Sequence, residues 1–291
     1  MAIPTFDEAV ARAAAVLNEA EAIVVAAGAG MGVDSGLPDF RGPEGFWRAY
    51  PAYKDLGLSF EAMADPEHFR RDPPLGWGFY GHRMNLYRAT TPHEGFGILR
   101  RWSELAPRGG FVFTSNVDDH FGRAGFDRER IVEVHGSIEW RQCLGGCGAG
   151  VFPADDRPVE VDPITFRAAK PLPSCPHCGA LARPNILMFG DWHWRAERVE
   201  AQHRRFADWL ETVAGRRIAV VELGAGGAIP TVRRTSEALV ADMGATLIRI
   251  NVREADVPRF QVGIAAPALA TLRAIDAAIR GHSGQADLDP R

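Results

Sequence analysis

Hydrophobic positions along this chain fall into short continuous runs, each bounded by polar or glycine-rich segments. Runs of four to eight apolar residues with such borders are typical of strands that are buried on both faces. The run Ala22–Ala27 is a clear example, and residues 218–221 begin a second predicted strand with such a run. We expect strands over 22–27, 110–114, 131–134, 186–189, 218–223 and 246–251.

Segments with helical periodicity separate these strands. Apolar residues spaced for one face of a helix predict helices over 6–20, 195–210, 231–242 and 267–280. Strands that alternate with helices imply a parallel sheet covered on both faces. The predicted class is therefore α/β, with a Rossmann-like parallel sheet and helices on both faces. Ligands of such sheets bind beyond the carboxyl ends of the strands.

Two stretches interrupt the alternation. Residues 43–92 are rich in aromatic residues and helix formers, and we refer to this segment as the helical module. Residues 137–183 hold every cysteine of the chain and few regular elements. We expect a Rossmann-like domain over 1–136 and 184–291, with the helical module inside it, and a small inserted module over 137–183.

Composition narrows the class of protein. The chain has 291 residues, 46% of them hydrophobic, so it is long enough to bury a large core. Its net charge is −4, which argues against a nucleic-acid partner. The start MAIPTFDEAV lacks a basic leader, and no apolar run is long enough to span a bilayer. We expect a cytoplasmic protein with no membrane partner, while its oligomeric state stays open.

The cysteines form two close pairs. Cys143 and Cys147 are followed much later by Cys175 and Cys178, and the chain has no other cysteine. In a cytoplasmic protein such pairs favour four thiolates around a tetrahedral zinc over disulfides. We expect one zinc per chain. Four sulfur ligands leave no position for water, so the zinc is expected to be structural, with His177 as a turn side chain between two ligands.

A glycine-rich turn follows the first strand. Gly28, Ala29 and Gly30 permit a tight turn and a close approach of backbone amides to a phosphate. Unpaired amides there predict a diphosphate site. Alone the signal is weak, because strand-to-helix turns also need glycine for steric reasons. The flanking Asp39, Phe40 and Arg41 make it specific.

With these flanking residues, the run AGAGMGVDSGLPDFRG resembles the cofactor loop GAGxSxxSGIPDFRG of the sirtuins, the NAD-dependent protein deacylases. Further segments resemble the family's motifs in the family's order, over about 22–272. The chain is identified as an atypical, bacterial-type member. The matching segments are TSNVD (114–118) for TQNID, HFGRAG (120–125) for LHxxAG, HG (135–136) for HG, RPNILMFGD (183–191) for RPxVVxFGE, and INVRE (250–254) for INxE.

The resemblance implies NAD as a consumed co-substrate and an acylated protein or peptide lysine as substrate. His135 takes the position of the base that deprotonates a ribose hydroxyl, a role that suits an imidazole. A histidine that merely caps a strand end is the alternative. Asn116 and Asp118 match the residues that hold the ribose and the nicotinamide carboxamide, and a turn or helix cap is their alternative role.

The resemblance assigns the remaining cofactor contacts to loop residues. Asp39, Phe40 and Arg41 would position the nicotinamide ribose and the phosphates, although Asp39 and Arg41 alone would suit a surface ion pair. The full set of expected cofactor residues is Gly28, Ala29, Gly30, Asp39, Phe40, Arg41, Ser115, Asn116, Asp118, Gly224, Ala225, Gly226 and Asn251.

Several positions depart from the family pattern. Gly32 stands at the usual Ser and Ser115 at the usual Gln. Gly224-Ala225-Gly226 replaces Gly-Thr-Ser, so the hydroxyl contacts to the cofactor are missing and only backbone amides remain for phosphate.

Substrate residues are expected at two places. Tyr80 and Arg83 match the Tyr-x-x-Arg of sirtuins that prefer succinyl or malonyl groups, since guanidinium and phenol together bind a carboxylate. Ordinary packing on an aromatic helix is the alternative for this pair. Phe189 and Gly190 lie in the segment expected to contact acyl-lysine. The bulky rings of 192–194 either line the substrate entrance or pack against the zinc module.

The sequence favours a protein-lysine deacylase of the deacetylase or the desuccinylase and demalonylase type, which releases nicotinamide and O-acyl-ADP-ribose. Two alternatives stay open. One is an ADP-ribosyltransferase or NAD glycohydrolase, and the other is a catalytically weak NAD-binding sensor or scaffold. The retained His135 favours deacylation, whereas the altered Gly224–Gly226 segment favours the sensor.

Overall fold

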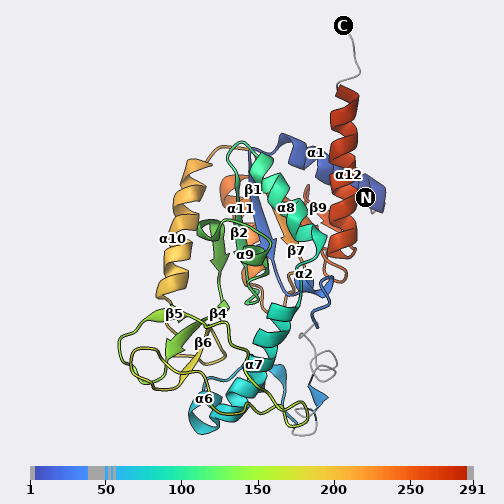
Figure 1. Cartoon of the computed structure of the whole chain (residues 1–291). Coiled ribbons are helices and arrows are strands. Elements are labelled where there is room, and N and C mark those ends of the chain that lie inside the picture. The colour runs from blue at the N-terminus through green and yellow to red at the C-terminus, as the bar shows by residue number, and fades with distance from the viewer. Residues whose placement is uncertain (1–3, 39–49, 52–53, 55–56, 287–291) are drawn as a thin grey trace.

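A six-stranded parallel sheet forms the centre of the molecule, in the order β3-β2-β1-β7-β8-β9 (Figure 1). The computed structural model describes residues 4–38, 50–51, 54 and 57–286. The strands are β1 (Ala22–Ala27), β2 (Gly110–Thr114), β3 (Ile131–Glu133), β7 (Ile218–Leu223), β8 (Thr246–Ile250) and β9 (Val262–Ile264).

Helices cover both faces of this sheet. On one face lie α1 (Phe6–Glu19), α8 (Glu94–Leu105) and α12 (Ala268–Ala286), and on the other α10 (Glu197–Thr212) and α11 (Thr231–Met243). Alternation along β1 explains the two layers, because successive side chains point to opposite faces. Ile23 and Val25 join the core under α1, α8 and α12, while Val24 and Ala26 join the core under α10 and α11.

A second, antiparallel sheet follows β3. It has three strands in the order β5-β4-β6, namely β4 (Gly136–Cys143), β5 (Val151–Pro153) and β6 (Ala182–Ile186). The helical module packs against it through α7 (Pro73–Ala89), α6 (His68–Arg71) and α5 (Phe60–Met63). A third apolar cluster joins the module to this sheet, and the Trp77 indole donates to the carbonyl of Ala182 at 2.9 Å.

Short elements connect the layers at the strand ends. They are α2 (Gly30–Val33) after β1, α9 (His120–Arg123) after β2, and a 3₁₀ turn, Arg128–Arg130, before β3. The first two follow the carboxyl ends of β1 and β2, the edge of the parallel sheet where ligands of such folds bind.

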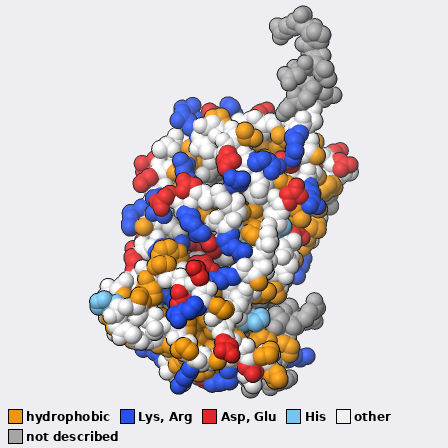
Figure 2. Space-filling view, viewed as in Figure 1, with side chains coloured by type: hydrophobic (Ala, Val, Ile, Leu, Met, Phe, Trp, Pro, Cys, Tyr) orange, Lys and Arg blue, Asp and Glu red, His pale blue; other side chains and the backbone are white. Residues whose placement is uncertain are grey.

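Charged side chains of both signs are interspersed over the face of the molecule seen in Figure 2. That distribution agrees with the small net charge of −4. Among the helices that the structure describes, none is long and apolar enough to cross a membrane.

The structure confirms the predicted α/β class and corrects one strand. Residues 186–189 were expected to form a strand of the parallel sheet, but β6 covers Ala182–Ile186 and pairs with β4 in the antiparallel sheet. Leu187 and Phe189 are 39% and 45% exposed, so this segment is a surface loop rather than a buried strand. A run of mixed apolar residues does not by itself show where a strand begins.

Candidate functional site

The parallel strands end level with one another, which brings the sequence motifs together. Ala27 pairs with both Thr114 and Leu223, Thr114 pairs with Glu133, and Leu223 pairs with Ile250. The segments that begin one or two residues later therefore share one edge of the sheet. These segments start at Gly28, Ser115, His135, Gly224 and Asn251.

The glycines after β1 lie directly against the loop after β7. A Cβ on Gly28 would be 2.7 Å from the Cα of Ala225, and one on Gly30 would be 2.6 Å from the Cα of Gly224. Gly224 itself has a φ of +57°, and a Cβ there would be 2.4 Å from the Cα of Gly30. Only glycine permits this contact of two backbones.

The amides of Gly28 and Gly30 are not among the unpaired amides of this turn. Gly28 donates to the carbonyl of Leu223 at 2.9 Å, and Gly30 donates to that of Gly224 at 3.1 Å. These glycines are therefore explained by the close contact of the two backbones, which leaves no room for a side chain. Within the described part of the chain, the amides of Ala29, Ala225 and Gly226 donate to no protein acceptor, so they remain available to an anion.

Asn251 and Glu254 hold the loop after β7 in place. The Asn251 amide donates to the carbonyl of Ala225 at 2.9 Å, and its own oxygen accepts from the backbone amides of Arg253 and Glu254. The Glu254 carboxylate accepts from the amide of Gly227 at 2.6 Å. This loop is thus shaped by hydrogen bonds without the hydroxyl side chains found in the family pattern.

Asn116 and Asp118 are buried beside the glycine turn. The Asn116 amide donates to the carbonyl of Gly28 at 3.0 Å. The Asp118 carboxylate accepts from the backbone amide of His120 at 3.0 Å, and its other oxygen lies 3.8 Å from the position of a Cβ on Gly32. Burial raises the pKa of Asp118, although the nearby His120 and Arg83 counteract it. Ser115 is also buried, and its hydroxyl hydrogen-bonds to no residue that the structure describes.

His135 and Gly136 connect the parallel sheet to the second sheet. His135 follows β3 and is partly buried, and its carbonyl accepts from the amide of Leu187 at 2.9 Å. Gly136 has a φ of +79°, and a Cβ there would be 2.0 Å from the carbonyl oxygen of Asn185. The backbone of β6 therefore requires the glycine, and this requirement fixes the place of the preceding histidine.

Tyr80 and Arg83 lie side by side on α7, inside the third apolar cluster. Their residues are 1% and 7% exposed. The Arg83 guanidinium lies 5.2–5.7 Å from the ring centres of Phe60, Phe79, Tyr80 and Tyr87. Its Nε and Nη2 donate to the Tyr87 hydroxyl at 2.9 and 2.6 Å. Burial raises the pKa of Tyr80, so the phenol stays a hydrogen-bond donor at neutral pH.

The loop after β6 is held in place by a buried ion pair, and several of its side chains are exposed to solvent. Arg183 and Asp191 form a buried ion pair at 2.7 Å, and the Asp191 carboxylate also accepts from the amides of Met188 and His193. Phe189 and Gly190 are exposed above it, and Trp192 is 93% exposed. Packing against the zinc module is therefore ruled out for Trp192, while Trp194 is half-buried.

The four cysteines come together at the end of the second sheet. Their sulfur atoms lie within 4.8 Å of one another, with Cys143 to Cys178 and Cys147 to Cys175 at 3.6 Å. Disulfide sulfurs are about 2.05 Å apart. Ligands of a tetrahedral zinc with Zn–S bonds of about 2.3 Å lie about 3.8 Å apart. The four thiols therefore fit one structural zinc, as predicted, and His177 is exposed.

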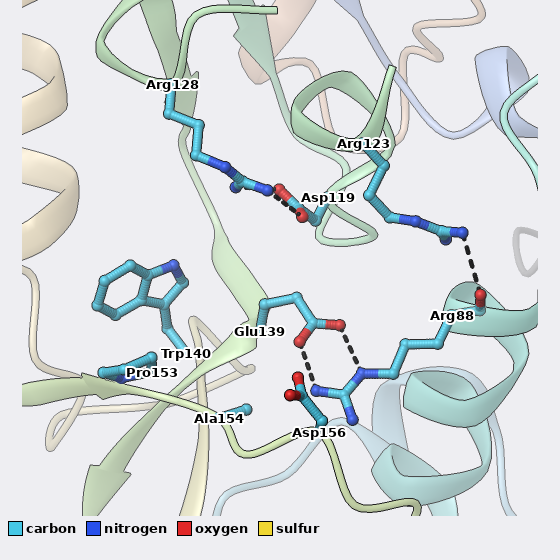
Figure 3. Close-up of a pocket in the computed structure, with 9 residues that line it drawn as sticks. All are labelled: Arg88, Asp119, Arg123, Arg128, Glu139, Trp140, Pro153, Ala154 and Asp156. Carbon is cyan, nitrogen blue, oxygen red and sulfur yellow. Dashed lines mark hydrogen bonds and ion pairs between the residues drawn. The ribbon is translucent and has the colours of Figure 1, made fainter. Parts of the chain in front are cut away.

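A cavity of about 410 Å³ opens between α7, α9 and β4 (Figure 3). Most of its charged groups bind one another or backbone carbonyls. Arg88 pairs with Glu139 at 2.5 Å, Arg128 pairs with Asp119 at 2.6 Å, and Arg123 donates to the carbonyls of Tyr87 and Arg88. Trp140 and Pro153 form its apolar side. The cavity joins the helical module to the second sheet and includes none of the predicted cofactor residues.

Three predicted cofactor residues, Asp39, Phe40 and Arg41, lie outside the described residues. The other predicted cofactor residues follow strands of the parallel sheet at the edge described above. Phe189 and Gly190 follow β6, and Tyr80 and Arg83 approach the same region from α7.

Comparison with known families decides the relationship. The sequence model of the Sir2 family matches residues 28–221. The chain belongs to the Sir2 family.

Sir2 relatives match the chain over most of its length. A protein from Thermococcus kodakarensis called an NAD-dependent protein deacylase is 32% identical over 248 residues, which is 84% of this chain and 85% of the relative. Sirtuin-5 of Danio rerio, called a mitochondrial NAD-dependent protein deacylase, is 35% identical over 60% of this chain and 58% of its own length. A crystal structure of a Sir2 homolog–NAD complex has the same fold, with a TM-score of 0.68 at 24% identity over 93% of this chain and 94% of that one.

Two residues near the Sir2 motifs were missed by sequence reasoning. Tyr87 lies one helical turn beyond Arg83 and takes two of its hydrogen bonds, and the spacing of four residues was the available signal. His120 is fully buried beside Asp118. The sequence feature that could have singled out His120 is the order of residues in HFGRAG, where His and Phe stand in place of the family's Leu and His.

Gly30→Ala in this Sir2 chain is expected to lower the free energy of unfolding by about 1–3 kcal/mol, because the added methyl meets backbone that has to move. NAD affinity should fall as well, since the two loops would separate. Gly97→Ala in α8 is the matched control, because a Cβ there meets nothing within 4 Å. Urea denaturation and NAD titration of both variants make the comparison. Equal stability of the two would show that the loop contact does not constrain the fold.

Proposed function

We propose that this protein is an NAD-dependent protein-lysine deacylase that releases nicotinamide and O-acyl-ADP-ribose. The observation that carries the proposal is the meeting of three motif segments at one sheet edge. The hydrogen bond from Asn116 to Gly28 joins two of them, and the pairing of Thr114 with Glu133 brings His135 to the same edge. Sir2 relatives that are 32% and 35% identical to this chain over the aligned residues are called deacylases, which supports the same activity.

In this proposal NAD supplies a glycosidic bond whose cleavage frees nicotinamide. Asn116 and Asp118 hold the nicotinamide ribose and the carboxamide, and the amides of Ala29, Ala225 and Gly226 face the phosphates. His135 accepts a proton from a ribose hydroxyl through its imidazole. Phe189 and Gly190 receive the acyl-lysine at the exposed side of the loop after β6.

We further propose that the chain divides at the second sheet. Residues 1–136 and 184–291 would be the NAD-binding domain, with the helical module at about 43–92, and residues 137–183 the zinc module. The change from parallel to antiparallel pairing between β3 and β4 supports this division.

A panel of acyl-lysine peptides tests the proposed function. The full protein is incubated with NAD and acetyl, succinyl or malonyl peptides, and both nicotinamide and deacylated peptide are quantified. Equal amounts of the two products are expected. Steady nicotinamide release without deacylated peptide would favour ADP-ribosyl transfer or NAD hydrolysis, and NAD binding without turnover would favour a sensor.

Acyl selection is assigned to Tyr80 and Arg83, with Tyr87 orienting the guanidinium. The position of the pair supports this role. Arg83 lies close enough to Asp118 to lower the pKa of that carboxyl. Tyr80 lies close enough to Arg183 and Asp191 for both charges to affect the pKa of its phenol. The pair is therefore between the cofactor motif and the loop that carries Phe189. A substrate carboxylate that reaches it finds a guanidinium removed from bulk water, where a charge-assisted bond is strong.

Arg83→Met is expected to remove a preference for succinyl-lysine and malonyl-lysine over acetyl-lysine. One charge-assisted hydrogen bond is worth about 1.5–3 kcal/mol, or about ten- to a hundredfold in kcat/KM. Cleavage of acetyl-lysine should persist. Arg88→Met on the same helix is the control, because Arg88 binds Glu139 in the cavity of Figure 3. Wild-type rates that are equal on acetyl and succinyl peptides would return Arg83 to a packing role.

A further inference from the structure

His120 is a buried imidazole that the proposed reaction does not use. The residue is fully buried, and its ring packs edge to face on Phe96 with the centres 5.8 Å apart. Neither ring nitrogen hydrogen-bonds to any residue that the structure describes. A neutral imidazole has one donor and one acceptor, and leaving both unbonded away from water is costly. A partner for these nitrogens is therefore required.

A small cavity beside the ring provides the place for that partner. Its volume is about 10 Å³, roughly the room that one water molecule needs. A buried water also needs two to four polar partners. The residues that line it include the polar or charged Thr114, Asn116, Asp118, Asp119, His120 and Glu133.

The loop that carries Asp118 and His120 is fixed from its outer side. Asp119 has a φ of +59°, a left-handed conformation that aspartate tolerates better than most residues. Its carboxylate binds both terminal nitrogens of Arg128, at 2.6 and 2.8 Å (Figure 3). A Cβ on Gly122 would be 2.5 Å from that carboxylate, so the glycine makes room for the ion pair. The Asp119 carboxylate thus lies on Arg128, while the neighbouring His120 ring is buried against Phe96.

Charged groups from two elements surround Asp118. On its own loop, His120 lowers the pKa of Asp118 and Asp119 raises it, while Arg83 and Tyr87 face it from α7. The backbone amide of His120 already binds one carboxylate oxygen. The main chain of His120 therefore hydrogen-bonds to the Asp118 carboxylate, and the His120 side chain interacts with the same carboxylate electrostatically.

We propose that His120 is a positioning residue for Asp118, and that one water molecule in this cavity links its imidazole to the carboxylate. Asp118 is thereby held in the orientation that the nicotinamide half of NAD requires. The proposal rests on the proposed function, which gives Asp118 its contact with the carboxamide. It concerns a position at which the family pattern LHxxAG has leucine.

Binding of NAD and of ADP-ribose, which lacks nicotinamide, separates this role from general stability. In His120→Leu the affinity for NAD should fall about tenfold, the loss of one buried hydrogen bond, while ADP-ribose affinity stays within about twofold. His120→Gln, whose amide retains a donor and an acceptor, should recover most of the NAD affinity. His203→Leu is the control, because that ring also packs edge to face on a phenylalanine, Phe113, at 5.8 Å. Calorimetric titration measures both nucleotides, and thermal unfolding monitors the fold.

Each other outcome overturns the proposal. NAD affinity that is unchanged in His120→Leu, or NAD and ADP-ribose affinities that fall equally, would show that the ring does not act through Asp118. If His120→Leu does not fold, His120→Phe keeps an aromatic ring against Phe96 and replaces it in the comparison. Failure of both to fold would make His120 a stability residue only.

The deacylase proposal fails separately. A wild-type protein that binds both nucleotides but deacylates no peptide would overturn the deacylase and leave the role of His120 standing. A competent deacylase whose His120→Leu variant distinguishes NAD from ADP-ribose as the wild type does would overturn the role of His120 alone. A wild type that binds neither nucleotide would overturn both.

Discussion

His135→Ala is expected to lower kcat for peptide deacylation by at least about a hundredfold, the usual effect of removing a general base. NAD affinity should change little, because the turn at Gly28 and the Asn116 amide hold each other without the imidazole. Nicotinamide release should fall less than peptide deacylation, since cleavage of the glycosidic bond needs no base on the ribose. The measurement is the rate of both products with the preferred acyl peptide.

His203→Ala provides the control for this variant. His203 is exposed on α10, and its ring contacts Phe113 rather than the motif segments. Its rate should match that of the wild type. Near-normal deacylation by His135→Ala would refute the role of His135, and the imidazole would then be a side chain that only closes the end of β3.

Cys175→Ala is expected to abolish zinc binding and to unfold the cysteine module. Cys175 is the most buried of the four thiols in the structure, and structural zinc sites contribute folding free energy directly. Wild-type protein should contain about one zinc per chain by elemental analysis, the amount that four thiolates around one ion require. Limited proteolysis within 137–183 reports the unfolding.

His177→Ala serves as the matched change in the same turn. The side chain is exposed between Cys175 and Cys178 and lies outside the four-thiol cluster, so zinc content and protease resistance should be unchanged. A folded, active wild-type preparation without zinc would contradict the assignment. Zinc loss in His177→Ala would instead place the imidazole among the ligands.

Much of the fold was predictable because buried parallel strands leave a simple signal. Strands 110–114 and 218–223 were predicted with the bounds that the structure has, since apolar residues predominate in both. The edge strand β9 was missed, because Val262–Ile264 has only three residues and the middle one is glycine. Residues 186–189 were misplaced because an exposed apolar loop has the composition of a strand.

Side-chain relationships within the candidate site were less accessible. Spacing alone predicted that four cysteines come together, because each pair presents two sulfurs to one ion. It did not show that the amides of Gly28 and Gly30 are taken by the loop after β7, since that contact joins residues nearly two hundred positions apart. It also did not show that Tyr87 binds Arg83, or that His120 is turned into the interior beside Asp118. Such contacts depend on the packing of whole elements, which local patterns do not encode.

The backbone contact between Gly30 and Gly224 limits how this enzyme can change over generations. The two loops belong to distant parts of the chain, yet neither has space for even a methyl group unless the other moves. A single substitution at either position is therefore harmful by itself, and a second substitution at the partner cannot supply the missing space. Most surface loops tolerate amino-acid substitutions, whereas Gly30 and Gly224 do not. Variation in nucleotide recognition is instead expected to accumulate beside it, at positions such as Ala225 and Gly226, whose amides are not committed to the contact.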